Sequence, residues 1–157
     1  MNHAFNQTWL IQKFEEIRKR TLLALQQLNE EQLNWRPDPA SLSISSLIRH
    51  IEGNIQERIA KGILNRQVTR DRDEELRQRN MSRFELESIV RDRFQFVIDT
   101  VQAMTEADME RTQPVRNRER TNLDVLHQCA THYSEHMGQI FYIAKQLLKD
   151  EYKSTSL

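Results

Sequence analysis

Apolar residues recur at alternating steps of three and four along most of the chain, a spacing that places them on one face of an α-helix. Four long stretches show this pattern: residues 4–29, 44–65, 83–104 and a last stretch that is capped at 121–124 and continues to about 149. No stretch shows the strict apolar–polar alternation that is typical of a β-strand. The pattern therefore predicts an all-α protein in which four helices form a bundle.

Residues that end or begin helices separate these stretches. Pro37 and Pro39 forbid helix continuation after the first helix, and residues 82–85 (Ser-Arg-Phe-Glu) match a capping box at the start of the third. Residues 66–80 form a polar connector long enough to run the length of a bundle, so the second and third helices can lie parallel. At 157 residues, the chain is expected to fold as one domain spanning residues 1–157.

Charge and composition exclude several classes of function. The 23 basic and 23 acidic side chains cancel, so nothing indicates a polyanionic partner such as nucleic acid. The longest apolar runs are far too short to span a membrane, and the first residues lack the basic and apolar regions of a secretion signal. A single cysteine, Cys129, excludes an internal disulfide and fits a reducing compartment, so we expect a cytoplasmic protein.

Two histidines in the last helix are the first candidates for chemistry. His132 and His136 are four residues apart, which stacks their imidazoles on one helix face, where two ring nitrogens can converge on one metal ion. His50, beside the apolar face of the second helix, is a third candidate ligand. Three neutral imidazoles suit zinc, nickel, iron or copper and leave at least one coordination position open for water or substrate.

The same spacing also fits a structural pair of partly buried, hydrogen-bonded histidines, and the pattern alone does not choose between the two interpretations. Asn54, Gln139 and Ser46 are candidates for partners that fix the ring tautomers of metal ligands, or are ordinary polar residues at a bundle edge. The sequence contains no nucleophile elbow, phosphate-binding glycine loop or zinc-ribbon cysteine set. Any catalysis would therefore depend on the metal.

Other conspicuous residues are expected to have simpler roles. His3 and His127 are expected to be solvated, because neither shares a helix face with the candidate ligands. Cys129 is expected to be a small buried hydrophobic residue rather than a ligand. The Arg–Asp alternation of residues 70–73 is expected to be a solvated surface.

The three glycines of the chain, Gly53, Gly62 and Gly138, lie inside segments that otherwise read as helix. Each costs about 1 kcal/mol there relative to alanine. We expect close backbone approach, or room for a ligand, to compensate for that cost.

Two motifs far apart in the sequence carry a family resemblance. Residues 50–54 read His-Ile-Glu-Gly-Asn, and residues 132–139 read His-Tyr-Ser-Glu-His-Met-Gly-Gln. Shorter matches extend the likeness over nearly the whole chain: Trp35-Arg36-Pro37, Ser43-Ile44, Arg70-Asp71-Arg72-Asp73 and Tyr152-Lys153. Together these residues resemble the DinB/YfiT-like superfamily of proposed metalloenzymes, and within it a bacterial branch of undefined function.

The resemblance implies a four-helix bundle in up-down-down-up order, with the long connector joining two parallel helices. It also implies one divalent metal, most often nickel or zinc and otherwise iron or manganese, held by His50, His132 and His136. Homodimers are common among relatives of this kind. Some of those relatives transfer low-molecular-weight thiols such as bacillithiol, mycothiol or glutathione.

Two hypotheses from different classes follow. In the first, the chain is a cytoplasmic, homodimeric metalloprotein that acts as a metal-dependent thiol S-transferase or hydrolase on a small molecule. In the second, it is a non-catalytic dimeric helical bundle that binds a small ligand or a protein partner, with the histidines structural or vestigially metal-binding. A polar pocket around the histidines with a nearby acid or base would favour the first.

Overall fold

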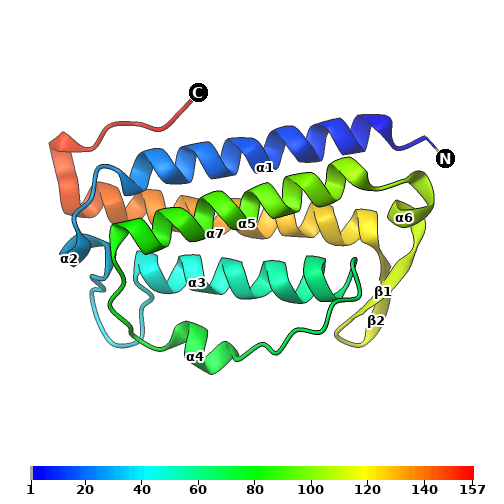
Figure 1. Cartoon of the computed structure of the whole chain (residues 1–157). Helices are drawn as coiled ribbons and strands as arrows, with labels where there is room; N and C mark the ends of the chain where they lie inside the picture. Colours follow the sequence, from blue (N-terminus) through cyan, green and yellow to red (C-terminus); the bar gives the residue numbers. More distant parts are fainter. Residues whose placement is uncertain (1) are drawn as a thin grey trace.

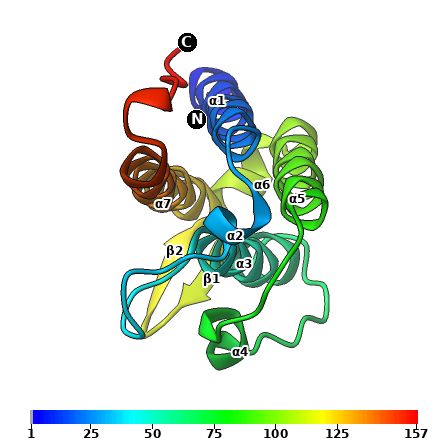
Figure 2. The same ribbon diagram turned by 90° about the vertical axis from the view of Figure 1, so that its left-hand side faces the viewer.

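The computed structural model describes residues 2–157, and in this part of the chain four long helices lie side by side (Figure 1). They are α1 (Ala4–Leu25), α3 (Ile44–Ile55), α5 (Arg83–Ala103) and α7 (Asn122–Leu148). A π-helical segment, η1 (Gln56–Lys61), continues α3. In the end-on view, α1 and α3 occupy opposite corners of the bundle, with α5 and α7 between them (Figure 2).

Side-chain caps fix where these helices begin. The Ser43 side chain accepts from the backbone N–H of Ser46 at the start of α3, and Thr121 does the same for Asp124 at the start of α7. Ser82 and Glu85 form the complete capping box predicted for α5. The core fills the space between the helices with side chains that are almost wholly buried, among them Leu10, Phe14, Ile55, Val97, Tyr133 and Ile140.

The predicted helical architecture is confirmed, since helix dominates the described residues. The long segment between η1 and α5 passes back along the outside of α3, and α3 and α5 run in the same direction (Figure 1). Within this segment lies a short helix that the sequence pattern did not predict, α4 (Arg72–Leu76). Arg49 on α3 holds it in place by donating hydrogen bonds to the carbonyl oxygens of Glu74 and Arg77.

The sequence pattern shows no strand-like alternation, but the structure contains two short strands. Strands β1 (Thr112–Val115) and β2 (Arg118–Thr121) form an antiparallel hairpin just before α7. Each strand has four residues, and every residue of β2 is charged or polar, so neither strand shows an apolar–polar alternation in its sequence. Tertiary contacts stabilise the hairpin, because the buried Gln113 side chain donates to Asn122 Oδ1 at 2.9 Å and to the Arg58 carbonyl at 3.3 Å.

The remaining helical segments are short: α2 (Glu30–Leu33), α6 (Glu106–Glu110) and η2 (Lys149–Glu151). Among residues 2–157, no helix combines the length and the apolar character that crossing a bilayer requires.

Candidate metal centre and adjoining cavity

The structure brings the three candidate histidines together from two helices. His50 projects from α3, and His132 and His136 project from successive turns of α7. One nitrogen from each ring lies within 4.8 Å of those of the other two. The Nε2 atoms of His132 and His136 are 2.8 Å apart, and the His50 ring meets both edge-on, with centroid distances of 5.4 and 5.0 Å. These three residues are called the histidine triad below.

A buried carboxylate from the connector orients His50. Glu75, in α4, places Oε2 3.3 Å from His50 Nδ1 and is 8% exposed. Arg70 binds the same carboxylate through two hydrogen bonds, Nε to Oε1 at 2.7 Å and Nη2 to Oε2 at 3.1 Å. Because the carboxylate accepts the Nδ1 proton of a neutral imidazole, His50 is left with a lone pair on Nε2, the arrangement found behind many metal-bound histidines.

Gly53 makes room for this carboxylate. A Cβ atom at that position would lie 1.7 Å from Glu75 Oε1. The expectation of close approach at a helical glycine is therefore confirmed here, and also at Gly62, where a Cβ would lie 2.0 Å from Gln113 Oε1. Gly138, in contrast, faces open space, with no atom within 4 Å of a Cβ built there.

The three residues that were candidates for fixing the ring tautomers have different surroundings. Gln139 Oε1 lies 2.7 Å from His136 Nδ1, so it can hold the second ring in the same tautomer as Glu75 holds the first. Asn54 instead accepts a hydrogen bond from the Tyr133 hydroxyl at 2.8 Å. Ser46 is buried at the beginning of α3, where its hydroxyl is bonded to that of Ser43.

Burial and neighbouring positive charge keep two of the rings neutral. Burial, then the charge of His136, lowers the pKa of His50, although Glu75 opposes the shift. The pKa of His132 falls to about 4 through burial, the other two histidines and the guanidinium groups of Arg70 and Arg72. Neutral imidazole is the form that binds a metal, so neither ring would need to release a proton to bind one near neutral pH.

Cys129 lies nearby but has the properties of a buried structural residue, as predicted. It is 4% exposed, and burial raises the pKa of its thiol to about 11. Within the described residues, the cluster capable of holding a metal consists of the histidine triad. Three imidazole donors, two of them with Nδ1 partners, fit a borderline divalent ion such as zinc, nickel or iron.

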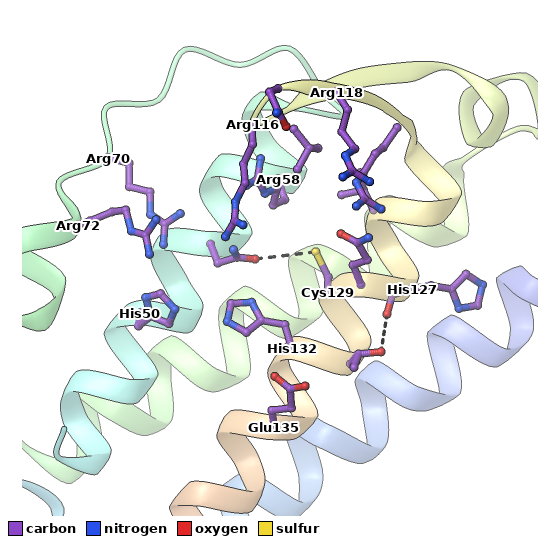
Figure 3. A pocket seen from close by; sticks show the side chains of 17 residues that line it. His50, Arg58, Arg70, Arg72, Arg116, Arg118, His127, Cys129, His132 and Glu135 are labelled. Atoms are coloured by element: carbon purple, nitrogen blue, oxygen red, sulfur yellow. Dashed lines mark hydrogen bonds between the residues drawn. The ribbon is translucent and has the colours of Figure 1, made fainter. Parts of the chain in front are cut away.

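A cavity of about 630 Å³ adjoins His50 and His132. Figure 3 shows arginine side chains reaching into it from η1, from the connector and from the hairpin. Its lining includes one carboxylate, Glu135, among residues 2–157. Six arginines also line it: Arg58, Arg70, Arg72, Arg116, Arg118 and Arg120.

Several expectations about these residues were wrong. The segment at 70–73 is not merely a solvated surface, because Arg70 is largely buried against Glu75. His3 is 6% exposed and bonds to Glu110 at 3.1 Å. His127 is half-buried, with its ring stacked on Trp9 at 5.3 Å and directed away from His132 (Figure 3).

Sequence reasoning also missed Glu75 and the arginines of the cavity. A single glutamate in a highly charged connector carries no periodic signal, and neither do arginines spread over three segments. The indirect signal was Gly53, whose place inside a helix indicated that another group comes close.

Comparison with known proteins agrees with this architecture. A family model described as "Protein of unknown function (DUF1572)" matches residues 4–157. The chain belongs to this family. Among curated proteins, none matches the chain.

Solved structures share the fold at low sequence identity. A DinB-like protein (YjoA) from Bacillus subtilis is 15% identical, with a TM-score of 0.70 over 94% of this chain and 97% of that one. A DinB-like protein from Bacillus cereus ATCC 10987 is 18% identical, with a TM-score of 0.71 over 88% of this chain and 90% of that one. The predicted resemblance to DinB-like proteins is therefore confirmed at the level of the fold.

Proposed function

We propose that the protein binds one divalent metal ion through His50, His132 and His136 and uses it to transform a small molecule in the adjoining cavity. The observation that carries this proposal is the convergence of the triad, whose ligand atoms lie within 4.8 Å of one another at the side of a cavity. A purely structural histidine pair would need neither the third ring nor the cavity.

The reaction that we propose is thiol S-transfer or hydrolysis. A bound divalent metal would lower the pKa of a coordinated water or thiol, so that a nucleophile is available near neutral pH. Glu75 and Gln139 orient His50 and His136 through their Nδ1 atoms. Glu135, on the same helix as two of the ligands, lines the cavity and supplies the carboxylate that takes up the proton of the nucleophile.

The polar cavity is what favours catalysis over the alternative of a non-catalytic bundle. It places a candidate base, Glu135, and several guanidinium groups beside the triad. A merely structural site would be expected to be closed and apolar around the rings.

Further features of the proposal have other sources. The family resemblance implies nickel or zinc as the metal and a homodimer, the chain length indicates one domain, and the single cysteine indicates a cytoplasmic location. The up-down-down-up order belongs with them, and the helix directions in Figure 1 support it.

The decisive experiment is elemental analysis of untagged protein, since a polyhistidine tag would itself bring nickel. We expect near-stoichiometric metal in the parent protein and none in a His50→Ala, His132→Ala double variant. His127→Ala is the matched control, because it removes an imidazole from the same helix but outside the triad, and it should retain the metal. No metal in the parent after reconstitution would refute the metal centre.

A second variant tests catalysis separately from binding. Glu135→Gln should keep the metal and lower the rate of thiol transfer or ester hydrolysis by about 10²–10⁴-fold, the usual contribution of a general base. An unchanged rate in that variant would remove Glu135 from the mechanism.

A further inference from the structure

The cavity beside the triad concentrates positive charge in a chain that is neutral overall. Six arginines and one glutamate line it, whereas the whole sequence has 23 basic and 23 acidic residues. Such a concentration is costly unless something negative occupies the site, because like charges repel within a concave surface.

Four of these guanidinium groups have no carboxylate partner. Arg70 is held by Glu75, and Arg120 pairs with Asp124 at 2.7 Å. For the other four, no acidic oxygen lies within 4.0 Å among residues 2–157. They are Arg58, Arg72, Arg116 and Arg118, called the free arginines below.

The free arginines come from three separate segments that tertiary packing brings to one place. Arg58 lies in the π-helical η1 and is half-buried, and Arg72 begins α4. Arg116 lies in the hairpin turn and Arg118 begins β2 (Figure 3). Arg116 has a positive φ of 57°, a conformation that is unfavourable for a residue with a side chain. π-helical turns and positive-φ residues are often retained where function requires a side chain in a particular place.

The cavity that holds the free arginines also reaches the histidines. His50 and His132 line it together with Arg58, Arg72, Arg116 and Arg118. An anion bound among these arginines would therefore lie in the same cavity as two members of the triad.

We propose that the cavity binds a small organic anion with at least two negatively charged groups, carboxylate or phosphate, and presents it to the histidine triad. Guanidinium groups bind both through paired N–H···O bonds, and a cavity of about 630 Å³ is the size of a metabolite site rather than a polymer groove. Calling the anion a substrate rests on the proposed metal-dependent function. Anion binding itself needs only the arginines.

The test uses full-length protein freed of metal with a chelator and then exchanged into chelator-free buffer, so that the anions cannot act by removing a metal. Inorganic pyrophosphate and citrate, titrated calorimetrically at low ionic strength, represent the phosphate and carboxylate alternatives, and acetate is the monoanionic control. We expect at least one of the two polyanions to bind, more tightly than acetate.

An Arg116→Gln, Arg118→Gln double variant should weaken that binding by at least about tenfold, the effect of losing one charge-assisted hydrogen bond. Both side chains are exposed, so the fold should be retained, which circular dichroism can check. The matched control is Arg83→Gln, Arg91→Gln on α5, which makes the same change in net charge outside the cavity and should bind like the parent.

The proposal would be overturned if the parent and the Arg116→Gln, Arg118→Gln variant bound the polyanion equally well, or if the parent bound neither polyanion. The two proposals can fail separately. If the metal-free protein binds a polyanion but elemental analysis finds no metal in the reconstituted parent, the anion site stands and the proposed metal function is refuted. If the parent holds metal but the metal-free protein binds neither polyanion, the metal centre stands and the anion site is refuted.

Discussion

Replacing Gly53 by alanine should displace the Glu75 carboxylate that orients His50 in the candidate metal centre. The added methyl group would lie 1.7 Å from Oε1 and 2.4 Å from Cδ of Glu75, so the carboxylate must move away. It would then lose its contact with His50 Nδ1 and both hydrogen bonds from Arg70. Gly138→Ala is a natural control, since it adds the same methyl group to a helix interior with no atom within 4 Å.

The two substitutions are expected to change the free energy of unfolding in opposite directions. Both substitutions gain about 1 kcal/mol of helix propensity in the free energy of unfolding. In Gly53→Ala this gain is opposed by the loss of a buried ion pair whose side chains are 10% and 11% exposed. Removing one partner of such a pair costs about 3–5 kcal/mol, and less here because Glu75 can turn towards solvent. Gly53→Ala should therefore be destabilised by about 1–2 kcal/mol, and Gly138→Ala stabilised by about 0.5–1 kcal/mol.

Urea unfolding followed by circular dichroism in excess chelator would measure this difference in the metal-free state. Metal affinity, measured by competition with a chelator of known strength, should fall about 10–100-fold in Gly53→Ala, the usual effect of losing a partner behind a metal ligand. Gly138→Ala should bind like the parent. If the two variants had equal stability and equal affinity, the account of Gly53 and Glu75 would be refuted.

Three other predictions test the surroundings of the triad. The pKa of His132 is lowered to about 4 in the folded chain, so the unfolded chain binds the proton more tightly. The urea midpoint of the metal-free protein should therefore be constant above pH 6.5 and fall between pH 6.5 and 4. The midpoint should fall less steeply over this range in His132→Gln. With the pKa of Cys129 raised to about 11, its native reaction with a disulfide reagent at pH 8 should be at least about 100-fold slower than in the urea-unfolded chain, and a comparable rate would contradict its burial. Tyr133→Phe leaves Asn54 Oδ1 without its 2.8 Å donor and should cost about 1–2 kcal/mol in urea unfolding, whereas no loss would mean that the buried amide finds another partner.

Local sequence patterns predicted the helices because their signals are local. The apolar seam of α7 and the caps at Ser43, Ser82 and Thr121 each depend on residues within one or two turns. The spacing of His132 and His136 likewise fixes their proximity once the segment is helical. The hairpin was missed for the opposite reason, since its short polar strands are held by the contacts of Gln113 with Asn122 and the Arg58 carbonyl.

The position of His50 could be predicted only in part from the sequence. His50 lies beside an aliphatic face, which made it a candidate third ligand, and its resemblance to a family motif then linked it with the histidines of α7. In the structure, bundle packing places it against the other two rings with centroid distances of 5.0 and 5.4 Å.

The sequence by itself thus determined the helical class, the helix starts and the two histidines that share a face of α7, because a helix has a fixed period that residue order records. Tertiary structure alone decided that Glu75 supports His50 and that arginines from η1, the connector and the hairpin line one cavity. These groups lie in segments without periodicity, so their meeting depends on how the connector and the hairpin pack against α3 and α7.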